Sequence, residues 1–259
     1  MSLHFSSLAK LTLTALSAAT LVACGGGDDD KPHVPLSSEC APPTTQVTAT
    51  SNYQMNWSDG SAAVRNEVLT INEVTQYEGK TVLRTRAAGR DTYSAPVNLQ
   101  GSLAYVALEE YYDWNSDKTR SYHGYAGSEK YGVDADQPPQ FRIAVDYSLA
   151  MIDKDYTPLV PGQQYDSPIN GKALVTKDEV TTPIVLNSST RHTYVGQETI
   201  AVPAGNLLAC KFTRHPGDGT VQHDWVQHGT GMLLRRMDVD ANGVVVQDQQ
   251  LINTTGFLR

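Results

Sequence analysis

Turn signals and strand-like runs alternate along most of this 259-residue chain, and this recurrence constrains its fold more than any other feature. β-branched and aromatic residues alternate with polar ones between the turns, as they do in half-buried strands. The strand-like runs are 64–76, 81–88, 103–113, 119–126, 140–149, 171–180, 191–202, 206–215, 220–228, 231–239 and 244–254. Beyond residue 24 no long stretch shows the 3.6-residue period of a helix. The pattern predicts an all-β antiparallel domain over residues 50–259.

The segment LAYVALEEYY, residues 103–112, has the composition of a helix by propensity alone. It runs into a turn signal at 114–117, and a strand-like stretch follows. We therefore expect a β-hairpin here.

The stretch 206–229, NLLACKFTRHPGDGTVQHDWVQHG, is the clearest hairpin of the sequence. With the turn at 216–219, Phe212 would face His223 and Lys211 would pair with Asp224 across the strands. The alternation predicts one core-facing surface. Its members would be Leu208, Cys210, Phe212, Val221, His223 and Trp225.

The N-terminus has the pattern of an export signal. Residues 1–10 contain a lysine and no acid, and residues 11–23 are uncharged and apolar or small. This apolar run is too short to span a membrane. Leu21-Val22-Ala23-Cys24 then resembles the lipobox of bacterial lipoproteins. The resemblance implies removal of residues 1–23 and acylation of Cys24, and two or more acyl chains would anchor the protein stably; the alternative is an ordinary secreted protein.

Residues 24–49 are rich in Gly, Pro, Ser, Thr and Asp, which predicts a flexible linker after the lipidated cysteine. In the lipoprotein-sorting system of Gram-negative bacteria, aspartate directly after the cysteine favours the inner membrane. Gly25 stands there, so the resemblance implies the outer membrane, with the protein facing the periplasm.

Two cysteines remain besides Cys24. In an oxidising compartment Cys40 and Cys210 are expected to form a disulfide that pins the end of the linker to the domain. The alternative is a free buried Cys210 with Cys40 loose in the linker.

A second resemblance lies in the C-terminal half. GQETIAVPAGNLLACK (196–211), then Trp225 and Gly229-Thr-Gly231, with LVPGQ upstream (159–163), resembles a motif of bacterial envelope proteins of unknown function, often lipoproteins. The resemblance covers about residues 156–256. It implies a curved antiparallel sheet or open half-barrel, like the lipoprotein carrier and receptor of outer-membrane sorting. The first half either adds strands to this sheet or forms a related half, with candidate halves 50–155 and 156–259.

Motifs for chemistry are lacking. There is no nucleophile elbow, zinc-protease helix, P-loop or C-x-x-C pair. His215, His223 and His228 do not converge in the expected hairpin register, so no metal site is expected. Glu109 and Glu110 are strand neighbours and should point to opposite faces, which does not suit a glycosidase pair. We expect neither an enzyme nor a cofactor, and the formal net charge of −8 argues against nucleic acid as a partner.

These observations favour a membrane-anchored envelope lipoprotein that binds a lipid or another amphipathic ligand without catalysis. The alternative is a scaffold or assembly factor that binds another envelope protein through a strand edge. A hydrolase of glycans or esters is a weaker third hypothesis. Tyrosines at 111, 112, 122, 125 and 131 could line a ligand cleft, although sheets favour such residues anyway.

Overall fold

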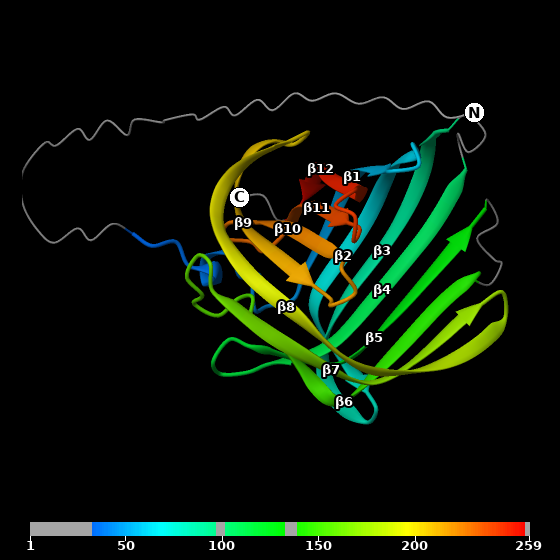
Figure 1. Ribbon diagram of the computed structural model, residues 1–259, viewed down its shortest axis with the longest axis horizontal. Helices are drawn as coiled ribbons and strands as arrows, with labels where there is room; N and C mark the ends of the chain where they lie inside the picture. The colour runs from blue at the N-terminus through cyan, green and yellow to red at the C-terminus, as the bar shows by residue number, and fades with distance from the viewer. Residues whose placement is uncertain (1–32, 97–101, 133–138, 257–259) are drawn as a thin grey trace, which may run out of the picture. The chain divides into compact units, whose positions relative to one another are not determined.

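The computed structural model describes residues 33–96, 102–132 and 139–256. Within them, strands follow one another in chain order around a closed antiparallel barrel, and the last strand pairs with the first (Figure 1). The strands are β1 (Val47–Trp57), β2 (Ala62–Tyr77), β3 (Lys80–Ala95), β4 (Leu103–Trp114), β5 (Arg120–Tyr131), β6 (Phe141–Asp153), β7 (Gln164–Lys177), β8 (Val180–Val202), β9 (Gly205–His215), β10 (Val221–Gln227), β11 (Leu233–Val239) and β12 (Val245–Thr255).

The all-β antiparallel class is confirmed, and 103–112 is a strand, but the sheet is closed rather than open. Closure depends on β1, which was not among the predicted strands. Its first residues were expected to belong to the linker, and the rest follow the linker directly. Met55 of β1 lies opposite Gln249 of β12, so the two ends of the sheet meet. The candidate halves also share one barrel, because β6 pairs directly with β7, for example through Val145 and Ala173.

The turn between β7 and β8 was missed, since the run 171–180 crosses it. Asp178 and Glu179 both have positive φ, 49° and 67°. Two positive φ values in a two-residue loop are the mark of a type I′ hairpin turn, which usually contains glycine. Without glycine the turn left no clear sequence signal.

The β9–β10 hairpin forms, but its register differs by one residue from the expected one. The Asp218 carboxylate accepts hydrogen bonds from the Thr220 backbone N–H (2.9 Å) and hydroxyl (2.6 Å), which draws Thr220 into the turn. Asp224 therefore lies opposite Phe212, and Trp225 lies opposite Lys211. A one-residue shift moves every side chain of a strand to the other face.

The predicted core face and the Lys211–Asp224 pair are therefore wrong. Phe212 and Cys210 face one side of the sheet, whereas Trp225 and His223 face the other. Leu208 is 44% exposed.

Register partners define the two faces of the barrel wall. Met55, Gln249, Arg236, Asp224 and Phe212 lie side by side on consecutive strands. Residues on this face surround a cavity that is lined from β2 round to β11, so it is the lumen face. The opposite side is the outer face.

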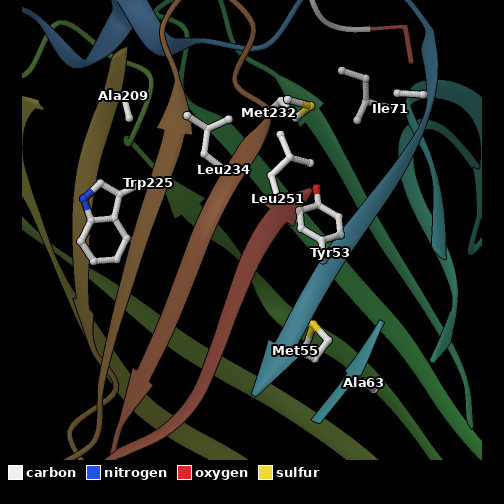
Figure 2. Packing of buried hydrophobic residues seen from close by; sticks show 10 residues of the cluster. Tyr53, Met55, Ala63, Ile71, Ala209, Trp225, Met232, Leu234 and Leu251 are labelled. Atoms are coloured by element: carbon white, nitrogen blue, oxygen red, sulfur yellow. The ribbon is translucent and has the colours of Figure 1, made fainter. Parts of the chain in front are cut away.

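The larger cluster of buried apolar side chains lies near β1 and β10–β12. Figure 2 shows Leu234, Leu251 and Tyr53 close together in this cluster, with Trp225 at its side. Trp225 lies under Lys211, whose Nζ is 4.7 Å from the ring centroid, and its indole N–H donates to Glu198. These contacts explain how a tryptophan on the outer face is only 5% exposed.

Residues 34–46, here called the strap, pack against loops at one end of the barrel. The strap contains a short 3-10 helix, η1 (Ser37–Cys40). Ser37 N–H donates to Leu159 in the β6–β7 loop, and Glu39 C=O accepts from Gly229 in the β10–β11 loop. The predicted disulfide, Cys40–Cys210, joins the strap to β9, and both cysteines are fully buried.

Candidate functional site

A belt of hydrogen-bonded polar side chains crosses the lumen face. Its members are Arg120, Asp153, Asp155, Tyr165, His192, Arg214, Asp224 and Arg236. They come from β5 to β11, except Asp155, which is the second residue after β6. Alternation within each strand aims the strand residues inward, because each shares the lumen face with its register partners.

Asp224 is the anion of one half of the belt. Both of its oxygens bind Arg236, at 2.7 and 3.1 Å, and Arg214 contacts it as well. Burial opposes its ionisation, but the two guanidinium groups outweigh burial and lower the pKa of Asp224. The carboxylate is therefore charged throughout the neutral range.

Asp155 is the anion of the other half. Arg214 donates to it at 2.6 Å, and His192 Nδ1 lies 3.2 Å away. Burial opposes the charge, and the Arg214 and His192 contacts outweigh it, so the pKa of Asp155 is far below its usual range. Arg214 thus binds both Asp155 and Asp224 and connects the parts of the belt around these two carboxylates.

Asp153, Asp155 and His192 place donor atoms within 4.8 Å of one another, which is the geometry of a metal site. The Tyr165 hydroxyl fills the space between them, 2.7 Å from Oδ1 of each aspartate and 3.0 Å from His192 Nδ1. Zinc would need ligands at about 2.0–2.2 Å in the same space. The cluster is therefore a hydrogen-bond network around Tyr165, whose single hydroxyl proton is shared between the two aspartates, and burial with the two carboxylates strongly raises the pKa of Tyr165.

Arg120 lies among aromatic rings at one end of the belt. Its guanidinium carbon is 4.7 Å from the Tyr156 ring centroid and 5.1 Å from that of Tyr122. One terminal nitrogen binds Asp153. Its Nε is buried and has no hydrogen-bond partner in the described structure.

The lumen cavity has a volume of about 410 Å³ and lies against the belt. Pro42 of the strap, Tyr122 and Glu110 are among its lining residues. Glu110 forms no hydrogen bond or ion pair with any described residue, although its charge acts on Arg120 and Tyr122. The cavity is therefore polar, with most of its charges already paired.

A second cavity, here called the outer groove, has a volume of about 540 Å³. Ala107, Ala126, Ala144 and Leu174 supply its apolar surface from β4 to β7. Glu109 lies opposite Ala126, Ala126 opposite Ala144, and Ala144 opposite Leu174. These side chains are therefore on the outer face, away from the belt.

Arg86, Glu109 and Arg142 stand at the outer groove. Glu109 accepts from Arg84 at 3.1 Å and lies 3.5 Å from Arg86. Arg142 is exposed and forms no ion pair or hydrogen bond with the described residues. The outer groove thus combines an apolar surface with a cation that has no partner in the described part of the chain.

The structure does not bring the histidines of the sequence analysis together. His223 bonds to Thr213, and His228 approaches Glu39 of the strap. Glu109 and Glu110 diverge as expected, one to the outer groove and one to the lumen. Cys24 lies outside the described residues.

The belt was not predicted from the sequence, and of its members only Asp224 belonged to a predicted pair. A charged residue that takes an apolar position in an alternating strand was the available signal, as at Arg214 beside Phe212. This signal could not be interpreted before the register between neighbouring strands was known, because a shift of one residue exchanges the two faces of a strand.

No protein-family model and no curated protein matches the chain. Among solved structures, the chain is similar to a protein of Parabacteroides distasonis ATCC 8503 described as a "putative lipoprotein", with 12% identity, a TM-score of 0.39, and coverage of 86% of this chain and 100% of that one. It is also similar to a beta-barrel-like protein of a domain of unknown function from Brucella abortus, with 7% identity, a TM-score of 0.42, and coverage of 84% and 100%. At these scores the likeness carries no argument about function. No helix in the described part of the chain is long and apolar enough to cross a membrane.

Proposed function

We propose that this protein is a membrane-anchored lipoprotein of the bacterial envelope that binds an anionic amphiphile in the outer groove, without catalysis. Acylation of Cys24 would supply the anchor. Gly25 after the cysteine favours the outer membrane with the barrel facing the periplasm. The observation that carries the binding proposal is the outer groove, where an apolar surface meets Arg142, a cation without a partner among the described residues.

Small side chains make room for a hydrocarbon chain in the outer groove. Ala107, Ala126 and Ala144 leave open the space that larger residues would fill. Its volume is within the range of small-molecule sites, about 300–1,000 Å³. Each methylene that leaves water contributes about 0.8 kcal/mol.

Arg142 supports an anionic head group. An exposed guanidinium without a partner attracts a carboxylate or phosphate and can bind it through two hydrogen bonds. A cationic amphiphile would instead meet the charges of Arg142 and Arg86. The lumen suits an acyl chain less well, because the chain would cover the charged belt without satisfying it.

Calorimetric titration of residues 25–259, exported to a periplasm without the lipid, tests the proposal. Dodecanoate should bind, and dodecyltrimethylammonium, of equal chain length, should not. Ala144→Trp should abolish binding by filling the outer groove, and Arg142→Gln should weaken it roughly tenfold or more, since a charge-assisted hydrogen bond is worth about 1.5–3 kcal/mol.

Arg90→Gln is the matched control, because Arg90 is exposed on β3 and does not line the outer groove. Equal binding of both amphiphiles would remove the role of Arg142. Unchanged dodecanoate binding by Ala144→Trp would overturn the site.

A scaffold function remains the second candidate, and one observation favours it. Pairing of β8 with β9 begins at Arg191, so residues 180–190 have no partner strand on that side in the described structure. Val180 and Val185 in this segment are 68% and 80% exposed. Such an edge can accept a strand from another protein.

A photo-crosslinker at Ile184, used in cells, tests the scaffold function. A single envelope protein should be captured, and Val185→Lys should lose it, since a lysine blocks strand addition. Capture of no partner would count against this function.

A further inference from the structure

The lumen cavity holds two polar groups that the fold leaves without partners. Arg214 and Arg236 bind Asp155 and Asp224, and Arg120 binds Asp153 through one terminal nitrogen. The buried Nε of Arg120 and the carboxylate of Glu110 have no hydrogen-bond partner among the described residues. We propose that this cavity binds a small organic amine that also carries a hydrogen-bond acceptor, at a site separate from the outer groove.

The two groups are close to one another on the lumen face. Glu110 and Tyr112 are two residues apart on β4 and therefore share that face. The Arg120 guanidinium lies 5.7 Å from the ring centroid of Tyr112 and 5.1 Å from that of Tyr122, which is opposite Tyr112 on β5. Glu110 and Arg120 line the same cavity, and the charge of Glu110 acts on Arg120, so a ligand in this cavity lies near both.

The hydrogen-bonding capacity of these groups defines the ligand. An N–H can only donate, so Arg120 Nε needs an acceptor such as a hydroxyl or carbonyl oxygen. An ionised carboxylate can only accept, so Glu110 needs donors. Arg120 Nε is buried without a partner, so a ligand that supplies an acceptor there recovers the free energy lost when this group was removed from water.

Charge favours an ammonium group as the donor. The three arginines of the belt are balanced by Asp153, Asp155 and Asp224, and Glu110 adds one negative charge. A neutral sugar would satisfy the hydrogen bonds but would leave the negative charge of Glu110 uncompensated. An anion would add a second negative charge to the cavity. An amine neutralises the charge of Glu110.

Three sugars of one size and different charge test the proposal by calorimetry: glucosamine, glucose and glucuronate. Glucosamine should bind, glucose should bind at least tenfold more weakly, and glucuronate should not bind. Glu110→Gln should weaken glucosamine binding roughly 10- to 100-fold, the value of a charge-assisted hydrogen bond. Glu109→Gln, the neighbouring substitution on the outer face, should leave glucosamine binding unchanged.

If Glu110→Gln still binds dodecanoate, the variant is folded and its outer groove is intact. A loss of glucosamine binding in that variant then concerns the lumen site alone. Equal affinity for glucose and glucosamine would overturn the amine in favour of a neutral carbohydrate. Absence of glucosamine binding up to about 10 mM in the unaltered protein would overturn the site, since even a weak Kd of about 1 mM would be seen.

Discussion

The lumen face and the outer groove lie on opposite sides of the barrel wall. The groove presents apolar side chains to solvent, whereas the lumen contains buried charged side chains. On β4, Glu109 joins an ion pair beside the outer groove, and Glu110 faces the lumen cavity. The outer groove exposes alanines and Leu174 to solvent, whereas the lumen buries Asp155 and Asp224. The lumen thus buries paired charges after β6 and along β8 to β11, whereas the outer face of β4 to β7 exposes an apolar groove, so neither face follows the usual rule of apolar residues inside and charges outside along its whole length.

The comparison shows that side chains are buried in this barrel in two ways, by ion pairing and by apolar packing. Apolar packing dominates near β1 and β10–β12, where Tyr53, Leu234 and Leu251 are buried. Across β5 to β11 each buried carboxylate instead has an arginine partner. A buried charge is tolerated when its partner is in place, and it becomes costly when that partner is removed.

Asp224→Asn should give the largest effect on stability. It leaves Arg214 and Arg236 without their shared anion, and loss of one partner from a buried pair costs about 3–5 kcal/mol. The free energy of unfolding in urea is the measurement. Arg142→Gln at the outer groove should change it by less than about 0.5 kcal/mol, as exposed substitutions do.

Equal losses in these two variants would remove the distinction between the faces. A loss below about 1 kcal/mol for Asp224→Asn would mean that the pair behaves as a surface salt bridge.

Glu67→Gln should have a smaller effect, of opposite sign. Burial raises the pKa of Glu67, and the attraction of Arg65 and Arg236 only partly offsets it. The pKa of this carboxylate is higher in the folded state than in the unfolded state, where it is near 4.5. Its contribution to the stability of the fold is therefore largest below pH 4.5 and is lost as the pH rises through the folded-state pKa. Gln at this position should therefore raise the melting temperature by a few degrees at pH 7.

The increase for Glu67→Gln should shrink as the pH falls below 4.5, which thermal melts across this range would record. A lower melting temperature than the unaltered protein at pH 7 would show that the two arginines outweigh burial.

Local sequence was sufficient to predict most strands, because alternation and turn residues act over a few positions. The turns at 78–80 and 240–243 contain glycines, Gly79 and Gly243, with φ near +80°, where other residues are strained. The Asp178–Glu179 turn adopts the same left-handed conformation without glycine, and there the prediction failed.

The candidate sites could not be predicted in the same way. The outer groove depends on Ala126 and Ala144 becoming neighbours across β5 and β6, and alanine carries no signal of its own. The belt depends on a register that a single residue, Thr220, shifted.

The sequence by itself determined the all-β class, most strand positions, the disulfide pair and the two faces of Glu109 and Glu110, because each follows from local periodicity or from the number of cysteines. Tertiary structure decided the closure through β1, the register of β9 against β10, and the assembly of Arg214 with Asp155 and Asp224. The physical reason is that a strand has two equivalent hydrogen-bonding edges and a period of two. Only pairing with a particular neighbour selects which edge is used and which side chains face the lumen.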